Sequence, residues 1–218
     1  MADYSGMRER MVKRQIAGRG VRSAVVLEAM RKVPRERFVP RGHGPFAYDD
    51  SPLPIGDGQT ISQPYIVAYM AEALELKAGE KVLEIGTGSG YAAAVLAEIA
   101  AEVYTVERIG SLATRAKEVL DDLGYKNIHL RQGDGSIGWP EQAPFDGIMV
   151  SAGAPEVPET LKRQLRIGGR LVIPVGASKA IQDLVRVTRV EEAEFETEGL
   201  SLVRFVPLIG QEGWHLQF

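Results

Sequence analysis

Short apolar runs alternate with amphipathic stretches through the middle of this chain. Five of the runs are apolar enough to be strands buried on both faces of a sheet. They span 81–85, 102–107, 127–131, 145–150 and 170–175. Apolar residues recur at helical spacing between most of these runs, at 91–100, 111–123 and 157–166. Because strand and helix alternate, the pattern predicts an α/β fold with a doubly wound, mostly parallel sheet.

The segments before and after this region follow other patterns. Residues 1–43 predict two short helices, and 65–76 predicts a third helix that precedes the sheet. Residues 38–64 are crowded with Pro and Gly and predict loops and turns. A loop of this length within a compact domain is usually functional. Near the end of the chain, 182–191 and 201–210 alternate apolar and polar residues, which predicts an antiparallel C-terminal strand pair.

The length and the apolar content indicate how many domains to expect. A chain of 218 residues with 44% hydrophobic residues can bury one sizeable core. We therefore expect a single domain over 1–218. An N-terminal helical cap and the functional loop would occupy 1–64, the α/β core 65–176, and the C-terminal strands 177–218.

Charge is segregated along the chain, although the formal net charge is only −3. Residues 1–43 carry 11 Lys and Arg against 4 Asp and Glu, whereas residues 44–218 carry 15 against 25. A basic arm can contact RNA or another acidic surface, or its charges can lie on the solvated face of packed helices. Val26, Met30 and Val33 recur at helical spacing, which favours the packed helices.

The composition excludes several kinds of site. The chain has no cysteine, so disulfides, thiolate nucleophiles and Cys-ligated zinc are excluded. Its three histidines are far apart and form no metal-ligand pattern, so we expect no metal. The N-terminal residues lack the apolar core of a signal peptide, and no apolar run approaches the ~18 residues that a membrane span needs. We expect a cytoplasmic protein that does not bind membranes.

The first candidate for chemistry is the segment KVLEIGTGSGY, residues 81–91, where a glycine-rich turn follows a strand. Gly86, Gly88 and Gly90 allow a cofactor to approach the backbone closely, because glycine has no Cβ and tolerates positive φ. The dinucleotide fingerprint G-x-G-x-x-G would need a glycine in place of Tyr91. No Lys-Ser/Thr pair follows the glycines, so the segment is not a P-loop either.

Two carboxylates follow the next two strands. Glu107 comes 21 residues after Gly86 and can accept hydrogen bonds from both hydroxyls of a ribose, or it can be a solvated strand end. Asp134 lies between Gly133 and Gly135 and can accept from the exocyclic amine of adenine, or it can form an Asp-Gly turn. The carboxyl ends of parallel strands form the ligand-binding edge of a doubly wound sheet. The three elements together predict an adenosine site without a phosphate site.

An adenosine site without a phosphate site matches S-adenosyl-L-methionine. Backbone N–H groups of the glycine loop would meet the methionine carboxylate. Glu84 could accept from the methionine ammonium, or it could be a partly buried structural acid, and the sequence leaves both roles open. The candidate cofactor-binding residues are Glu84, Gly86, Thr87, Gly88, Ser89, Gly90, Glu107, Arg108, Asp134 and Gly135.

Several longer segments carry a family resemblance. They are VPRERFVP, AYDDSPLPIGDGQTISQPYIVAYM, VLEIGTGSGYAAAVLA, VYTVERI, GDGSIGWPEQAPFDGIMVSAGAPEVP, GGRLVIPVG and VRFVPLIGQEGW. Through them the chain resembles the protein-L-isoaspartate (D-aspartate) O-methyltransferase family along nearly its whole length. The glycine loop and the acidic strand end are shared by many methyltransferases, whereas PLPIGDGQTISQP and GDGSIGWPE are far more specific.

The resemblance implies the S-adenosylmethionine-dependent methyltransferase fold and a protein repair reaction. The methyl group would move to the free α-carboxylate of an L-isoaspartyl residue in a damaged protein or peptide, with D-aspartyl residues as a further candidate substrate. The methyl ester would convert through a succinimide to aspartate, and S-adenosyl-L-homocysteine would be the other product. Because a carboxylate is already ionised at neutral pH, the nucleophile needs no general base.

The resemblance also implies that Ser62 is the active-site residue. A serine before a predicted helix can instead cap the helix, and the two roles are compatible. We expect an extended peptide to lie across the loop and to pair with the last predicted strand. The candidate substrate-binding residues are Thr60, Ile61, Gln63, Val206 and Leu208.

Three rival functions have weaker support. A nucleic-acid methyltransferase would grip phosphates with the basic arm, but 1–43 contains no aromatic stacking cluster and the chain has no N-P-P-Y-like motif. A serine hydrolase would need G-x-S-x-G, and neither Ser62 nor Ser89 has glycines on both sides at that spacing. A cofactor-binding module without activity would be recognised only by its lack of turnover. We expect a monomer that binds no nucleic acid.

Overall fold

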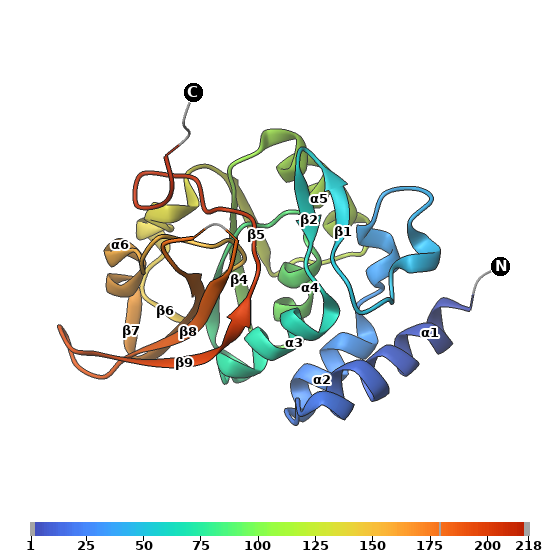
Figure 1. Cartoon of the computed structure of the whole chain (residues 1–218), viewed down its shortest axis with the longest axis horizontal. Helices are drawn as coiled ribbons and strands as arrows, with labels where there is room; N and C mark the ends of the chain where they lie inside the picture. The colour runs from blue at the N-terminus through green and yellow to red at the C-terminus, as the bar shows by residue number, and fades with distance from the viewer. Residues whose placement is uncertain (1–2, 179, 216–218) are drawn as a thin grey trace.

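A sheet of seven strands runs through the molecule in the order β5-β4-β3-β6-β7-β8-β9 (Figure 1). The computed structural model describes residues 3–178 and 180–215, so the outermost residues of the domain expected from the sequence lie outside the described part. The five strands from β5 to β7 are parallel, and β8 and β9 are antiparallel additions. This confirms the predicted doubly wound, mostly parallel fold. The strands are β3 (Lys81–Ile85), β4 (Glu102–Glu107), β5 (Ile128–Gln132), β6 (Phe145–Val150), β7 (Leu165–Val175), β8 (Gln182–Arg189) and β9 (Phe195–Val203).

Helices cover both faces of this sheet, because the apolar strands bury side chains in both directions. Val82 packs into the core beneath α2 to α5, and its neighbour Leu83 packs into the core beneath α6. The helices are α1 (Tyr4–Arg10), α2 (Ala24–Lys32), α3 (Pro64–Ala73), α4 (Tyr91–Ala97), α5 (Gly110–Asp122) and α6 (Glu159–Arg163). Shorter turns are the π-helical Met11–Ile16 and the 3-10 turns Ala17–Arg19, Arg35–Phe38, Gly44–Phe46, Gly135–Ile137 and Pro140–Gln142.

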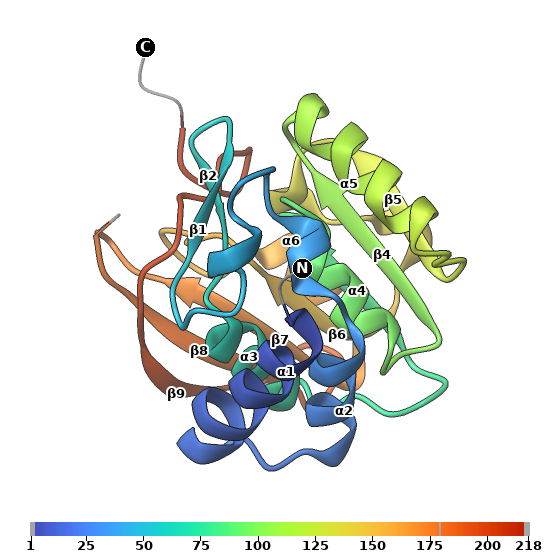
Figure 2. The same cartoon turned by 90° about the vertical axis from the view of Figure 1, so that its right-hand side faces the viewer.

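The N-terminal helices pack as a cap beside α3 (Figures 1 and 2). Val26, Met30 and Val33 are at most 2% exposed, which confirms the apolar stripe predicted for this region. Basic side chains of the cap form ion pairs with acidic neighbours, as Arg31 does with Glu9 at 3.1 Å. The basic character of the first 43 residues therefore arises in part from the solvated outer face of packed helices.

Two predicted segments have a different secondary structure from the one expected. The helix expected at 157–166 is only the short α6. The chain enters β7 at Leu165, where it pairs with Phe145 of β6. The loop expected at 38–64 contains an antiparallel hairpin of β1 (Leu53–Gly56) and β2 (Gln59–Ile61), which is separate from the large sheet. The two strands are too short to show an alternating pattern, and the Pro and Gly around them are typical of loops.

The structure confirms an antiparallel C-terminal strand pair, but its second strand lies earlier in the chain than the predicted 201–210. The strand that pairs with β8 is β9, in the acidic segment that the sequence pattern treated as a connection. Most of its side chains are exposed at the sheet edge, so β9 carries no apolar alternation that a pattern could detect. The mostly apolar segment 204–210 instead leaves the sheet after β9 and lies against the segment after β6.

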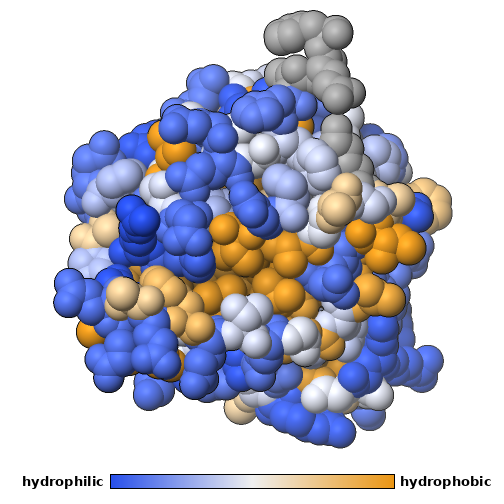
Figure 3. Space-filling model, turned by 60° about the vertical axis from the view of Figure 1, so that its left-hand side comes forward, coloured by the Kyte–Doolittle hydropathy of each residue, from blue (hydrophilic) through white to orange (hydrophobic). Residues whose placement is uncertain are grey.

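Apolar side chains also reach the surface. Figure 3 shows a group of them in the middle of one face, bordered by hydrophilic residues. None of the helices formed by the described residues combines the length and the apolar character that a bilayer crossing requires.

Candidate functional site

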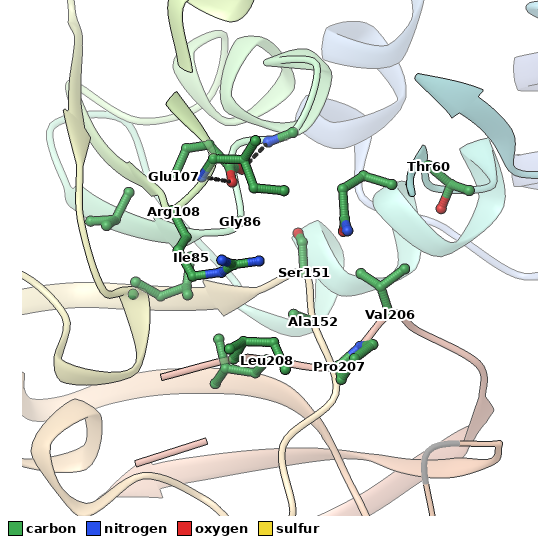
Figure 4. Close-up of a pocket in the computed structure, with 16 residues that line it drawn as sticks. Thr60, Ile85, Gly86, Glu107, Arg108, Ser151, Ala152, Val206, Pro207 and Leu208 are labelled. Carbon is green, nitrogen blue, oxygen red and sulfur yellow. Dashed lines mark hydrogen bonds between the residues drawn. The ribbon is translucent and has the colours of Figure 1, made fainter. Parts of the chain in front are cut away.

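A pocket opens where β3, β4 and β6 end, at the edge of the sheet that the sequence indicated (Figure 4). Its wall includes Gly86, Gly88, Glu107, Arg108, Gly135 and Ser151. We call this the main pocket. A smaller cavity, which we call the side cavity, shares part of that wall and contains Ser62 and Glu84. Most of the candidate cofactor and substrate residues thus meet in two adjoining spaces, and Gly90, Asp134 and Gln63 line neither.

The glycine loop has the backbone conformation that its glycines predicted. Gly86, Gly88 and Gly90 have φ angles of 90°, 55° and 89°, a region that residues with a Cβ rarely adopt. The N–H of Gly86 donates to the carbonyl of Val106 at 2.9 Å, which ties the loop to β4. Between the glycines, Thr87 and Ser89 line the side cavity.

Glu107 is held firmly at the end of β4. One carboxylate oxygen accepts from the N–H of Gly88 and the other from the N–H of Ile109, both at 2.8 Å. The residue is only 6% exposed, which rules out the alternative of a solvated strand end. A carboxylate offers about four lone-pair positions, so each oxygen keeps one for a further donor in the main pocket. Two hydroxyls of a ribose are donors of that kind.

Glu84 is fully buried beneath the loop and partly unpaired. Its Oε2 accepts from the Thr105 hydroxyl at 2.6 Å, while its Oε1 has no hydrogen-bond partner among the described residues. Burial raises the pKa of this carboxyl to about 8, and the Thr105 hydrogen bond offsets only part of that rise. A cation beside Oε1 would stabilise the ionised form. The site therefore fits an ammonium group.

Arg108 reaches across the main pocket. Figure 4 shows its guanidinium directed toward Ser151, with Leu208 on the wall below. The side chain is exposed and makes no hydrogen bond or ion pair with another described residue. A planar cation in this position can stack on the face of an adenine ring.

Asp134 has a structural role beside the main pocket. Its Oδ1 accepts from the N–H and the hydroxyl of Ser136 at 2.8 and 2.7 Å, and its Oδ2 accepts from the N–H of Gln211 at 2.7 Å. Gly135 lines the main pocket, but Asp134 does not. A Cβ on Gly135 would overlap the Cγ2 of Ile85, so only glycine fits there. The arrangement favours the Asp-Gly turn over the expected contact with adenine.

Ser62 is free to act in the side cavity. Helix α3 begins at Pro64 with Gln63 as its N-cap, and no side chain caps this helix end, so Ser62 is not a cap. Its hydroxyl has no hydrogen-bond partner among the described residues, and Thr60 and Ile61 line the same cavity. Gln63 lines neither space, because its side-chain amide donates to the backbone carbonyl of Asp50 at 3.1 Å.

The expectation of peptide pairing along Val206 and Leu208 is wrong for the edge that faces Gly153. The carbonyl of Val206 accepts from the N–H of Gly153, and the N–H of Leu208 donates to the carbonyl of Gly153, both at 2.8 Å. The carbonyl of Leu208 accepts from the N–H of Trp214 at 2.7 Å. These backbone groups of Val206 and Leu208 are therefore already hydrogen-bonded within the chain. The side chains of Val206 and Leu208 still line the main pocket.

Ser151 and Ala152 also line the site, although neither was among the candidate cofactor-binding or substrate-binding residues. They follow β6 and line the main pocket beside the glycine loop, since a Cβ on Gly86 would lie 3.6 Å from the Cβ of Ser151. Their position after a parallel strand was the signal that could have found them. Within the described residues, no group of three or more His, Asp or Glu side chains could hold a metal ion.

Comparison with known proteins decides which family this site belongs to. The sequence model of the protein-L-isoaspartate(D-aspartate) O-methyltransferase family matches residues 7–213. The chain belongs to this family. One member, protein-L-isoaspartate O-methyltransferase 1 of Rhodopseudomonas palustris (strain HaA2), is 63% identical over 97% of this chain and 86% of the relative. Protein-L-isoaspartate O-methyltransferase 2 of Pelobacter propionicus is 60% identical over 95% of this chain and 92% of the relative.

Solved structures of the protein-L-isoaspartate O-methyltransferase family share the fold. One superposes with a TM-score of 0.86 and 32% identity, covering 94% of this chain and 67% of that structure. A candidate member from Plasmodium falciparum, in complex with S-adenosyl-L-homocysteine, gives a TM-score of 0.78 and 25% identity over 96% of this chain and 99% of its own. The family and its cofactor therefore agree with the adenosine site predicted from the sequence.

Proposed function

We propose that this chain transfers the methyl group of S-adenosyl-L-methionine to the free α-carboxylate of L-isoaspartyl residues in proteins and peptides. One observation about the site of this chain carries the proposal. The unpaired hydroxyl of Ser62 and the unpaired oxygen of Glu84 share the side cavity, which adjoins the main pocket at Gly86 and Gly88. Membership in the protein-L-isoaspartate O-methyltransferase family supports the same reaction.

The two carboxylates have separate binding roles in this proposal. Glu107 accepts from the ribose hydroxyls with the lone pairs that its two backbone hydrogen bonds leave free. Glu84 accepts from the methionine ammonium with Oε1. Gly86 and Gly88 leave room for the cofactor because neither carries a Cβ. Arg108 stacks on the adenine ring, which needs no contact from Asp134.

The chemical step requires positioning more than proton transfer. The cofactor supplies a methyl group that is activated by its positively charged sulfur. Ser62 donates a hydrogen bond to one oxygen of the α-carboxylate, which directs the other oxygen toward the methyl carbon. The new O–C bond forms as the C–S bond breaks, and the bonding electrons move to sulfur. Because the carboxylate is ionised at neutral pH, no residue has to remove a proton.

Repair follows from the methyl ester without further help from the protein. A neighbouring backbone nitrogen attacks the ester and releases methanol, which gives a succinimide. Hydrolysis of the succinimide yields aspartate in part. Action as a monomer with a single domain stays a prediction from the sequence. The cytoplasmic location expected from the sequence stays a prediction.

Transfer of a labelled methyl group tests the proposed function. The substrate is a peptide with one isoaspartyl residue, and the matched control contains aspartate at the same position. A D-aspartyl peptide is a third arm that tests the wider substrate range. We expect label on the isoaspartyl peptide and none on the aspartyl control. Equal labelling of both, or no labelling while S-adenosyl-L-homocysteine still binds, would refute the substrate assignment.

A further inference from the structure

The β1–β2 hairpin covers the glycine loop from above. It pairs with no strand of the seven-stranded sheet, and Figure 1 shows its tip next to the first turn of α5. Ile55 is buried at 4% exposure, and its Cδ1 lies 3.5 Å from the position of a Cβ on Gly88. Gln59 and Thr60 from the second strand line the main pocket. The hairpin is therefore a wall of the cofactor site, and its strand β2 leads directly into Ser62.

Only a few contacts hold the tip of this wall in place. Asp57, at the turn, has a φ of 53° and lies between Gly56 and Gly58. Its Oδ2 accepts from the guanidinium of Arg115 at 2.7 Å and from the hydroxyl of Ser111 at 2.9 Å. Both donors belong to α5. The side chains of Asp57 and Arg115 are 39% and 52% exposed, so the contact can be changed without disturbing the core.

The two partners differ in how firmly the fold holds them. Leu112, Ala116 and Leu120 bury one side of α5 against the sheet, so Arg115 projects from a rigid helix. A two-stranded hairpin on its own is marginally stable in water. The position of the hairpin therefore depends on Ile55 and Ile61 in the core and on Asp57 at the tip. Loss of the Asp57 contact would let the tip of the hairpin lift away from the glycine loop.

We propose that Asp57 and Arg115 are a positioning pair that holds the hairpin closed over the bound cofactor and sets the place of Thr60 and Ser62. This rests on the proposed function. The apparent affinity of a site falls in proportion to the fraction of molecules in the competent state. Breaking the pair therefore speeds release of the cofactor product and weakens peptide binding, while the chemical step in closed molecules is unchanged.

The dissociation rate of S-adenosyl-L-homocysteine, measured by stopped flow, tests the pair. Asp57→Asn and Arg115→Gln each remove one charge, and we expect each to raise the rate about 2- to 5-fold, the range of an exposed ion pair. The KM for an isoaspartyl peptide should rise by a similar factor, with kcat within about 2-fold of the wild type. Arg115→Lys keeps the charge, so its dissociation rate and its peptide KM should stay close to those of the wild type. High salt should speed release from the wild type more than from Asp57→Asn.

The same helix offers a matched control. Lys117 and Asp121 form an exposed ion pair on α5 at 2.7 Å and do not contact the hairpin. Lys117→Gln should leave the dissociation rate and the peptide KM unchanged. The double variant Asp57→Asn/Arg115→Gln should release product no faster than the stronger single variant, because both act on one contact.

Three outcomes would overturn the proposal: an unchanged dissociation rate in Asp57→Asn, an equal change in Lys117→Gln, or fully additive effects in the double variant. Dissociation of S-adenosyl-L-homocysteine is measured without peptide. A chain that fails to methylate isoaspartyl peptide therefore refutes the proposed function and leaves this test intact.

Discussion

Replacing Glu84 with glutamine separates its two suggested roles, as a ligand of the ammonium and as a buried structural acid. The carboxyl is fully buried, and burial raises its pKa from 4.5 to about 8. At about 1.4 kcal/mol per pKa unit, this rise corresponds to about 5 kcal/mol for ionising Glu84 in the folded protein. The figure is an upper limit, because the fold can relax around the charge.

The sign of the effect on stability follows from proton binding. The folded protein holds the Glu84 proton more tightly than the unfolded chain does. The free energy of unfolding of the wild type therefore falls as the pH rises from about 4.5 to about 8 and then levels off. Glu84→Gln has no proton to lose, so we expect it to become the more stable protein across this interval. Urea unfolding at several pH values measures the difference, which should approach but not exceed about 5 kcal/mol.

Glu84→Gln should raise the stability of the protein but lower its affinity for the cofactor. Because burial raises the pKa of Glu84 to about 8, most of Glu84 is protonated at pH 7, so binding an ammonium against Oε1 should release a proton. Calorimetry with S-adenosyl-L-homocysteine in buffers of different ionisation enthalpy measures this release. Glu84→Gln should bind at least 10-fold more weakly and release none, since a hydrogen bond to a charged group contributes about 1.5–3 kcal/mol.

Glu107→Gln is the control for this experiment, since it changes a carboxylate of the same site. It should weaken binding but keep the proton release. If Glu84→Gln bound as tightly as the wild type, or released the same number of protons, the ammonium role would be refuted. A stability difference that did not grow with pH would refute the argument from burial.

Three further variants test the site more briefly. Ser62→Ala should lower kcat/KM for the isoaspartyl peptide about 10- to 100-fold, the range of a hydrogen bond to a carboxylate, and leave the affinity for S-adenosyl-L-homocysteine within about 2-fold. Loss of that affinity would assign Ser62 to the cofactor instead. Gly135→Ala should destabilise the protein by about 1–3 kcal/mol, because its Cβ overlaps Ile85, and a normal melting temperature would contradict the close approach. Asp134→Ala should lower the melting temperature, because Ser136 and Gln211 lose their acceptor. If it changed only the affinity for the adenosine part of the cofactor, Asp134 would be an adenine ligand after all.

The parallel part of the sheet could be predicted from the sequence because its signals are local. A strand buried on both faces needs a mostly apolar run, and 81–85 and 145–150 are mostly apolar. The glycine loop was equally clear, since positive φ at Gly86 and Gly88 restricts the choice of residue at each position. Family resemblance added the role of Ser62, which spacing alone does not reveal.

The tertiary structure decided which groups of the site are free to act. The carboxylates of Glu107 and Asp134 follow comparable strands, yet only Glu107 lines the main pocket, whereas Asp134 lies beside it and accepts from Ser136 and Gln211. The backbone near Val206 looked available until the fold paired it with Gly153. Contacts of this kind join segments far apart along the chain, so no local pattern of side chains contains them. A sequence shows which hydrogen-bonding groups a protein has, and only the folded chain shows which of them it has already paired with itself.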